Sequence, residues 1–223
     1  MPAAPFAFRL LCGRSRPRAR VYPPPRFRFL SLPFEVIPLL PHEHPERLIA
    51  DEIRAAIEEV SEADLNALVE AIAAAGKTFV YGAGRSGFMM QALAMRLGHL
   101  GLHAWVVGET TTPAIGPGDL LIIGSGSGQT KTTLAIVEAA CSRGAKTACL
   151  TAHADSPIAQ FSDLVVLIPS PVTKVDVDRP SQQPPGSLFE QCLLVLGDGI
   201  VMRLVARLGT NEDEMRARHT KLE

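Results

Sequence analysis

The spacing of hydrophobic positions along the chain changes near residue 78. Between residues 45 and 76, apolar side chains recur every three or four residues in two stretches, and Ser61–Asp64 between them has the pattern of a helix cap. From residue 78 onward, short apolar runs alternate with longer stretches of helical spacing. The pattern therefore predicts a pair of N-terminal helices followed by alternating strands and helices.

Five short apolar runs have the length and composition of buried strands. They are residues 78–81, 104–107, 120–123, 147–151 and 164–168. Helical patterns separate them, among them 88–100, a stretch that ends near Arg143, and a start at Ser156-Pro157. Strands joined through helices run parallel, so the sequence predicts an α/β fold with a doubly wound parallel sheet.

The C-terminal third predicts a loop followed by two helices. Residues 169–186 hold five prolines and are expected to form a long loop. Residues 187–208 are apolar on almost every side, which predicts a buried helix that packs against another subunit. A cap within residues 210–213 begins a short final helix.

The stretch 119–133 carries the first candidate chemistry. A strand pattern breaks into alternating glycines and hydroxyl side chains before a helix begins: Gly124, Ser125, Gly126, Ser127, Gly128 and Thr130. Glycines let a ligand approach the backbone, and a helix start offers N–H groups and a positive dipole end. No Gly-Lys-[Ser/Thr] closes the loop, which argues against a nucleotide triphosphate and favours a small phosphate ester. The alternative is a plain turn.

A second glycine-rich loop follows the strand at 78–81. Gly82–Gly87 has the outline of a dinucleotide fingerprint, and Glu109 follows at a distance that keeps this option open. Arg85 and Ser86 inside the loop suit a small anionic ligand better than a pyrophosphate turn. Because parallel strands end at one edge of the sheet, we expect both loops to form one site.

Composition narrows the class of protein. The 223 residues have a formal charge of −1, which argues against general nucleic-acid binding, and no apolar stretch is long enough to span a bilayer. The four cysteines lack metal-ligand spacing. Three lie in apolar segments, which predicts buried thiols in a reducing, cytoplasmic protein without membrane or nucleic-acid partners.

The N-terminal segment differs from the rest of the chain. Residues 1–34 hold seven arginines, seven prolines and no acidic residue. We expect residues 1–43 to be a disordered basic extension, and residues 44–223 to form one domain. A transit peptide, a basic arm for acidic partners and translated sequence upstream of the true start are the alternatives.

Several blocks together resemble the sugar isomerase (SIS) domain, and more narrowly the 6-phospho-3-hexuloisomerase family. The blocks are YGAGRSG at 81–87, AMRLGHLG at 94–101, VVGET at 106–110, GSGSGQT at 124–130, PPGSLFE at 184–190 and ARHTKLE at 217–223. The resemblance covers about residues 45–223. It implies a flavodoxin-like three-layer α/β/α sandwich, assembled as a homotetramer. It also implies interconversion of D-arabino-hex-3-ulose 6-phosphate and D-fructose 6-phosphate without a cofactor or metal.

The resemblance also assigns roles to residues. It implies that a phosphate is held by hydroxyl side chains in the two glycine-rich loops, around Gly84 and Gly128: Ser86, Ser125, Ser127 and Thr130. Glu190 would be the base that moves a proton between C2 and C3 through a cis-enediol, and His219 the second acid or base. Arg85 and Arg96 would orient sugar oxygens or stabilise the enediolate. Gln129 departs from the family, which more often has Glu there.

Alternatives remain open at this point. Ser187 and Glu190 have the spacing of a capping box, so Glu190 also fits a structural role. His219 lies near a chain end, and it bears on catalysis only if oligomer packing orders that tail over a site. Rival functions are an arabinose 5-phosphate or phosphoheptose isomerase of the same superfamily, and a sugar-phosphate sensor without turnover.

Overall fold

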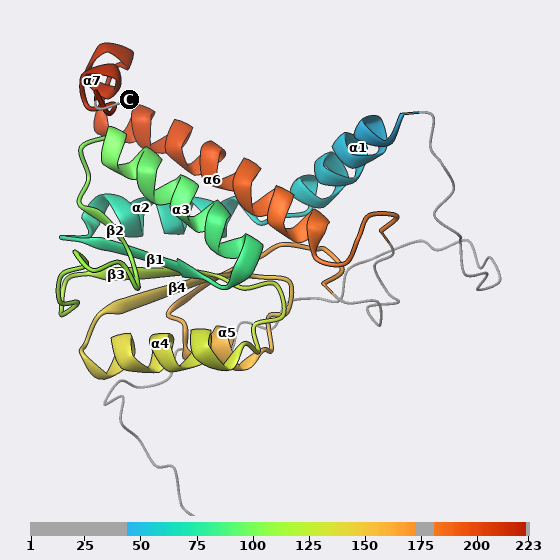
Figure 1. Cartoon of the computed structure of the whole chain (residues 1–223), viewed down its shortest axis with the longest axis horizontal. Helices are drawn as coiled ribbons and strands as arrows, with labels where there is room; N and C mark the ends of the chain where they lie inside the picture. The colour runs from blue at the N-terminus through green and yellow to red at the C-terminus, as the bar shows by residue number, and fades with distance from the viewer. Residues whose placement is uncertain (1–43, 173–180, 222–223) are drawn as a thin grey trace, which may run out of the picture.

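A parallel sheet of five strands lies between two layers of helices in the computed structural model, which describes residues 44–172 and 181–221 (Figure 1). The strands are β1 (Thr78–Gly82), β2 (Ala104–Val106), β3 (Leu120–Gly124), β4 (Lys146–Thr151) and β5 (Leu164–Leu167). Their order is β2-β1-β3-β4-β5, and every neighbouring pair is parallel. This order is that of flavodoxin, so the predicted α/β sandwich is confirmed. The predicted extension 1–43 lies outside the described residues.

The helices are divided unequally between the two faces of the sheet. One face carries α1 (Pro45–Glu58), α2 (Glu62–Ala74), α3 (Gly84–His99) and α6 (Ser187–Leu208). The other carries α4 (Lys131–Ser142) and α5 (Pro157–Phe161). The short helix α7 (Glu212–Ala217) follows α6 and contacts α3. Figure 1 shows this arrangement, with α7 at the upper left.

Alternating strand residues fill the two layers of core. Val80 and Ile122 point to the layer of α2, α3 and α6, whereas Phe79, Leu121 and Ile123 point to the layer of α4. The central strand β3 is buried along its whole length, as expected where both faces of a sheet are covered. The short apolar runs in the sequence therefore mark strands buried on both faces.

Local signals for helix starts were mostly correct. The Ser61 and Ser156 hydroxyls accept hydrogen bonds from the third residue of α2 and α5, as predicted. Asn211, inside the predicted capping stretch, caps α7. The helix predicted from residue 88 begins at Gly84, because the second half of the glycine-rich loop is already helical.

The helix predicted to be buried on all sides is only partly covered within one chain. On α6, Val195 is 45% and Met202 is 74% exposed. On α3, which packs against α6, Phe88 is 63% and Met95 is 51% exposed. Each pair is seven residues apart and so lies on one side of its helix. We call these four residues the outer apolar face. No helix in the described part of the chain is long and apolar enough to cross a membrane.

Candidate active site

The order of the strands creates a crevice between β1 and β3. The chain leaves β1 for β2 on one side and leaves β3 for β4 on the other, so α3 and α4 cover opposite faces (Figure 1). Gly82 and Gly124, the last residues of these two strands, pair with each other. Ligands of open α/β sheets bind at this kind of topological switch point. Both predicted loops follow these two residues, so the structure brings them together.

Besides α1, three helices begin at this end of the molecule without a side-chain cap. They are α3 after Ala83, α4 after Thr130 and α6 after Gly186. In Figure 1 all three begin on the right-hand side. The first N–H groups of a helix have no partner inside the helix, and their dipole favours negative charge. The end of the sheet is therefore suited to an anion.

The loop between β3 and α4, residues 125–130, is held by backbone contacts. The amide of Ser125 donates to Leu150 O at 3.0 Å, and the amide of Ala152 donates to Gly126 O at 3.0 Å. Gly128 has a φ of +60°, and a side chain there would collide with the hydroxyl of Ser156. Ser125 is buried, and Ser127 and Thr130 are half-buried. The loop thus places its hydroxyl groups in one fixed arrangement.

An ion pair joins α3 to α6 beside this loop. Arg85 Nη1 donates to Glu190 Oε2 at 2.8 Å, and the two side chains are 48% and 17% exposed. Glu190 lies one residue after Phe189, whose ring approaches Gly126 of the loop. The capping box is wrong, because Gly186 is the N-cap of α6 and makes no side-chain cap. The carboxylate of Glu190 faces Arg85 of the glycine-rich turn instead.

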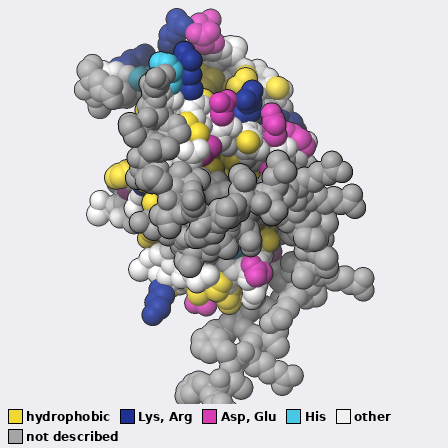
Figure 2. Space-filling view, turned by 90° about the vertical axis from the view of Figure 1, so that its right-hand side faces the viewer, with side chains coloured by type: hydrophobic (Ala, Val, Ile, Leu, Met, Phe, Trp, Pro, Cys, Tyr) yellow, Lys and Arg dark blue, Asp and Glu magenta, His cyan; other side chains and the backbone are white. Residues whose placement is uncertain are grey.

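The remaining predicted residues lie at the other end of α3. The ring of His219 stacks on the ring of His99, with centroids 4.9 Å apart and an interplanar angle of 28°. Arg96 is exposed on the same turn of α3. Figure 2 shows Lys, Arg and His side chains together with acidic ones at the top of the molecule, at the height of α7 in Figure 1. At 1.5 Å per residue, Arg96 and His99 lie about 16 and 21 Å from Arg85 along α3.

The predicted site residues therefore fall into two groups within one chain. The first group surrounds the crevice: Gly84, Arg85, Ser86, Ser125, Ser127, Gly128, Thr130 and Glu190. The second group consists of Arg96 and His219, with His99 as their neighbour. Burial lowers the pKa of His99, and the charges of His219 and Arg96 lower that pKa further. The neutral form of this imidazole is favoured.

Sequence reasoning missed Glu52 of α1. Its Oε2 accepts hydrogen bonds from Ser181 Oγ at 2.6 Å and Gln183 Nε2 at 2.9 Å, and its Oε1 accepts from the Gln182 amide at 3.0 Å. These three residues lead into α6 and Glu190. The partners are about 130 positions apart in the sequence, and no local pattern marks such a contact.

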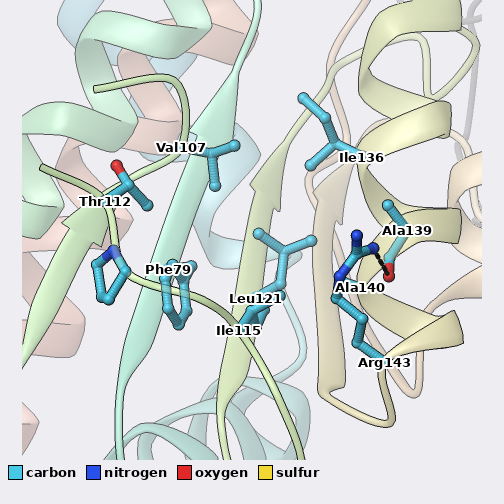
Figure 3. A pocket seen from close by; sticks show the side chains of 10 residues that line it. Phe79, Val107, Thr112, Ile115, Leu121, Ile136, Ala139, Ala140 and Arg143 are labelled. Atoms are coloured by element: carbon cyan, nitrogen blue, oxygen red, sulfur yellow. Dashed lines mark hydrogen bonds between the residues drawn. The ribbon is translucent and has the colours of Figure 1, made fainter. Parts of the chain in front are cut away.

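A separate pocket lies on the α4 face of the sheet (Figure 3). Its lining is largely apolar and includes Phe79, Leu121 and Ile136; Arg143 lies at its edge and donates to Ala139 O at 2.9 Å. None of the predicted site residues is among the described residues that line it. An apolar lining does not suit a sugar phosphate, so we do not assign the substrate to this pocket.

The described residues give little indication of a reactive thiolate or of a metal-binding site. Burial raises the pKa of Cys149 and of Cys192 to about 12, so both remain thiols rather than nucleophilic thiolates. Cys141 is half-buried. The described residues contain no group of three or more His, Cys, Asp or Glu placed to hold a metal ion.

Comparisons with known proteins agree with this fold. Residues 71–181 match the SIS domain. The chain is 40% identical to the 3-hexulose-6-phosphate isomerase of Mycobacterium gastri over 79% of this chain and 88% of that protein. It is 38% identical to the Bacillus subtilis protein of the same name, over 78% and 95%.

A solved structure from Methanococcus jannaschii supports the same assignment. It superposes with a TM-score of 0.71 and 29% identity, covering 81% of this chain and 99% of that one. A molecular function of 3-hexulose-6-phosphate isomerase was inferred from that structure. The chain described here belongs to the family of the 3-hexulose-6-phosphate isomerases and carries their SIS domain.

Proposed function

We propose that this protein interconverts D-arabino-hex-3-ulose 6-phosphate and D-fructose 6-phosphate. The observation that carries the proposal is the Arg85–Glu190 ion pair, which lies beside a loop of hydroxyl groups at the switch point of the sheet. A carboxylate, a guanidinium and an anion site together meet the needs of an enediol isomerisation. Membership of the isomerase family supports the same reaction.

The phosphate binds in the loop after β3. Ser125, Ser127 and Thr130 supply hydroxyl donors, and Ser86 adds a fourth from the first turn of α3. The first amides of α4 complete the anion site. Gln129, where the resemblance expects Glu, is exposed and carries no charge, so it adds no repulsion toward a phosphate.

Glu190 is the base in this mechanism. Its carboxylate takes the proton from C3 of fructose 6-phosphate, and the electrons of the C3–H bond form the C2=C3 double bond. The oxygen on C2 gains the negative charge, which the guanidinium of Arg85 stabilises. The oxygen on C2 then takes up the proton that the C3 hydroxyl gives up, carried between them by the second acid or base. As the C3 oxygen becomes the carbonyl, the electrons of the C2=C3 bond take the proton back from Glu190 at C2, so Glu190 ends as a carboxylate. One base serves both carbons, so proton transfer on a single face fits a cis-enediol.

We further propose that the protein is a homotetramer whose active sites are shared between subunits. The outer apolar face exposes four large apolar side chains on two neighbouring helices, α3 and α6, which supports its burial against a second copy. Arg96 lies near the C-terminal end of α3 and His219 stacks beside that end, so both lie too far from the crevice of their own chain to reach it. A neighbouring subunit would bring its His219 to the crevice as the second acid or base.

The test follows proton exchange. The protein and its Glu190→Gln variant are incubated with fructose 6-phosphate in heavy water and followed by NMR. We expect deuterium at C3 of the fructose 6-phosphate together with formation of the 3-ulose. In the variant, the rate of both should fall about 10²- to 10⁴-fold. Glu138→Gln, an exposed change on α4, is the matched control and should retain activity.

The other outcomes distinguish the rival functions. Exchange without the 3-ulose would indicate a different sugar-phosphate isomerase, such as the arabinose 5-phosphate or phosphoheptose type. Ligand-dependent line broadening without any exchange would identify a sugar-phosphate sensor and contradict the isomerase. Unchanged activity in Glu190→Gln would remove Glu190 from the role of base.

A further inference from the structure

The C-terminal tail after α7 contacts the end of α3 through two adjacent residues, Arg218 and His219. We infer that Arg218 is a positioning residue, which fastens this tail to α3 and thereby sets the place of His219. This inference rests on the proposed role of His219 in the reaction. It assigns a function to a side chain that has no part in the chemistry described above.

The first contact is a hydrogen bond to the end of the helix. Arg218 Nη1 donates to the carbonyl oxygen of His99, the last residue of α3, at 3.3 Å. The final carbonyls of a helix have no partner within it, and they carry the negative end of its dipole. A guanidinium is therefore well matched to this position, and the contact draws the tail onto the end of α3.

The second contact is possible because Gly101 has no side chain. Gly101 follows the end of α3 with a φ of +85°, and Arg218 lies against it. A Cβ atom built on Gly101 would stand 3.1 Å from both Cζ and Nε of Arg218. Any side chain here would press on the planar group, so Gly101 leaves the space that the guanidinium occupies.

The third contact is made by the next residue along the chain. The ring of His219 stacks on the ring of His99, while Arg218 holds the carbonyl of that same residue. His99 is only 8% exposed and thus provides a fixed surface. Arg218 and His219 therefore both contact His99, and these two contacts set the position and the orientation of the His219 imidazole.

Little else in the described part of α7 anchors this tail. The helix has six residues, none of them buried, and of these Met215 packs against the core. Arg216 provides a direct comparison, because its ion pair is with Glu212 of the same helix, at 2.6 Å. Arg218 has the equivalent pair, with Glu214 of α7 at 3.5 Å, and in addition it contacts the end of α3.

The test compares Arg218→Gln with Arg216→Gln in the full-length protein. We expect Arg218→Gln to lower kcat about tenfold and to leave KM for fructose 6-phosphate within about twofold, because phosphate binding lies in the other group. Arg216→Gln should match the wild type. In a His219→Ala background, Arg218→Gln should cause no further loss, since it acts through the imidazole that is already absent.

Two outcomes would overturn the inference. Equal losses of kcat in Arg216→Gln and Arg218→Gln would show that the effect comes from the loss of a positive charge and not from the contacts of Arg218. A further tenfold loss of kcat in the His219→Ala background would show that Arg218 does not act through His219. A second readout is independent of turnover: stacking on His99 shifts the ring protons of His219 in NMR, and Arg218→Gln should move them toward free histidine.

The ring-proton shift of His219 also distinguishes the catalytic role of His219 from its anchoring by Arg218. If His219→Ala leaves kcat unchanged, the proposed catalytic role of His219 fails, while a changed ring-proton shift still supports Arg218 as the anchor. If His219→Ala abolishes turnover but neither kcat nor the shift responds to Arg218→Gln, the anchoring by Arg218 alone is wrong.

Discussion

Glu190 shows how one side chain takes its role from a distant partner. In sequence it stands three positions after Ser187 and reads as half of a capping box. In the fold, Gly186 provides the cap position, and the carboxylate bonds to Arg85, 105 positions away. A carboxylate used locally would not be available to a substrate, whereas one paired across two helices faces the crevice.

Gly128 is the residue whose replacement should damage the phosphate loop most directly. We expect Gly128→Ala to lower the free energy of unfolding by about 1 to 3 kcal/mol, because φ is +60° and the new methyl group meets Ser156. KM should rise as the hydroxyl groups of the loop are displaced. Chemical denaturation and steady-state kinetics measure the two effects.

Gly116→Ala is the control for this change. A Cβ at Gly116 would have open space, and its φ lies outside the left-handed region, so stability and KM should stay near the wild type. A Gly128→Ala protein with unchanged stability and KM would show that the loop can move without consequence, and would count against it as a preorganised phosphate site.

At the scale of elements, α6 is positioned by α1 as well as by the sheet. Glu52 accepts hydrogen bonds from three consecutive residues that lead into α6. We expect Glu52→Ala to loosen residues 181–186 and to lower kcat several-fold, because the first turn of α6 carries Glu190. Hydrogen exchange should rise in a peptide spanning 181–190.

The comparison for this prediction is Glu59→Ala, at the exposed C-terminal end of α1. That change removes the same charge at the C-cap of the same helix, without touching the segment before α6. If hydrogen exchange in 181–190 responds equally to both substitutions, the effect belongs to the stability of α1 as a whole rather than to the contacts of Glu52.

At the scale of the whole molecule, the two groups of site residues lie at opposite ends of α3. One chain presents Glu190 at the crevice and His219 beside the end of the helix. The outer apolar face lies along α3 and α6; α6 carries Glu190, and His219 lies against the end of α3. Packing through this face would therefore bring Glu190 of one chain and His219 of another to the same interface.

Mixed subunits test this arrangement. Glu190→Gln and His219→Ala proteins, each expected to have only low residual activity, are mixed in equal amounts under conditions that exchange subunits. If a site combines Glu190 of one chain with His219 of another, random pairing should restore about a quarter of wild-type activity. Activity that remains at the average of the two parents would contradict shared sites, even if the protein is a tetramer.

Much of the fold could be read from local pattern. The five apolar runs match the strands to within about a residue at each end, and residues 187–208 match α6 as predicted. The Ser61 and Ser156 caps were also predicted. These features depend on side-chain periodicity and on groups three positions apart, which the sequence displays directly. The start of α3 was predicted at residue 88 but lies at Gly84, because the glycines of its first turn do not have a helical pattern.

The sequence by itself determined the strands, the parallel sheet and the hydroxyl-rich loop that an anion would occupy, because each is encoded over a few neighbouring residues. The tertiary structure decided that Arg85 faces Glu190, that Glu52 holds the segment before α6, and that His219 lies far from both on its own chain. These relations depend on how crossovers bring distant segments together. No spacing along the chain contains that information.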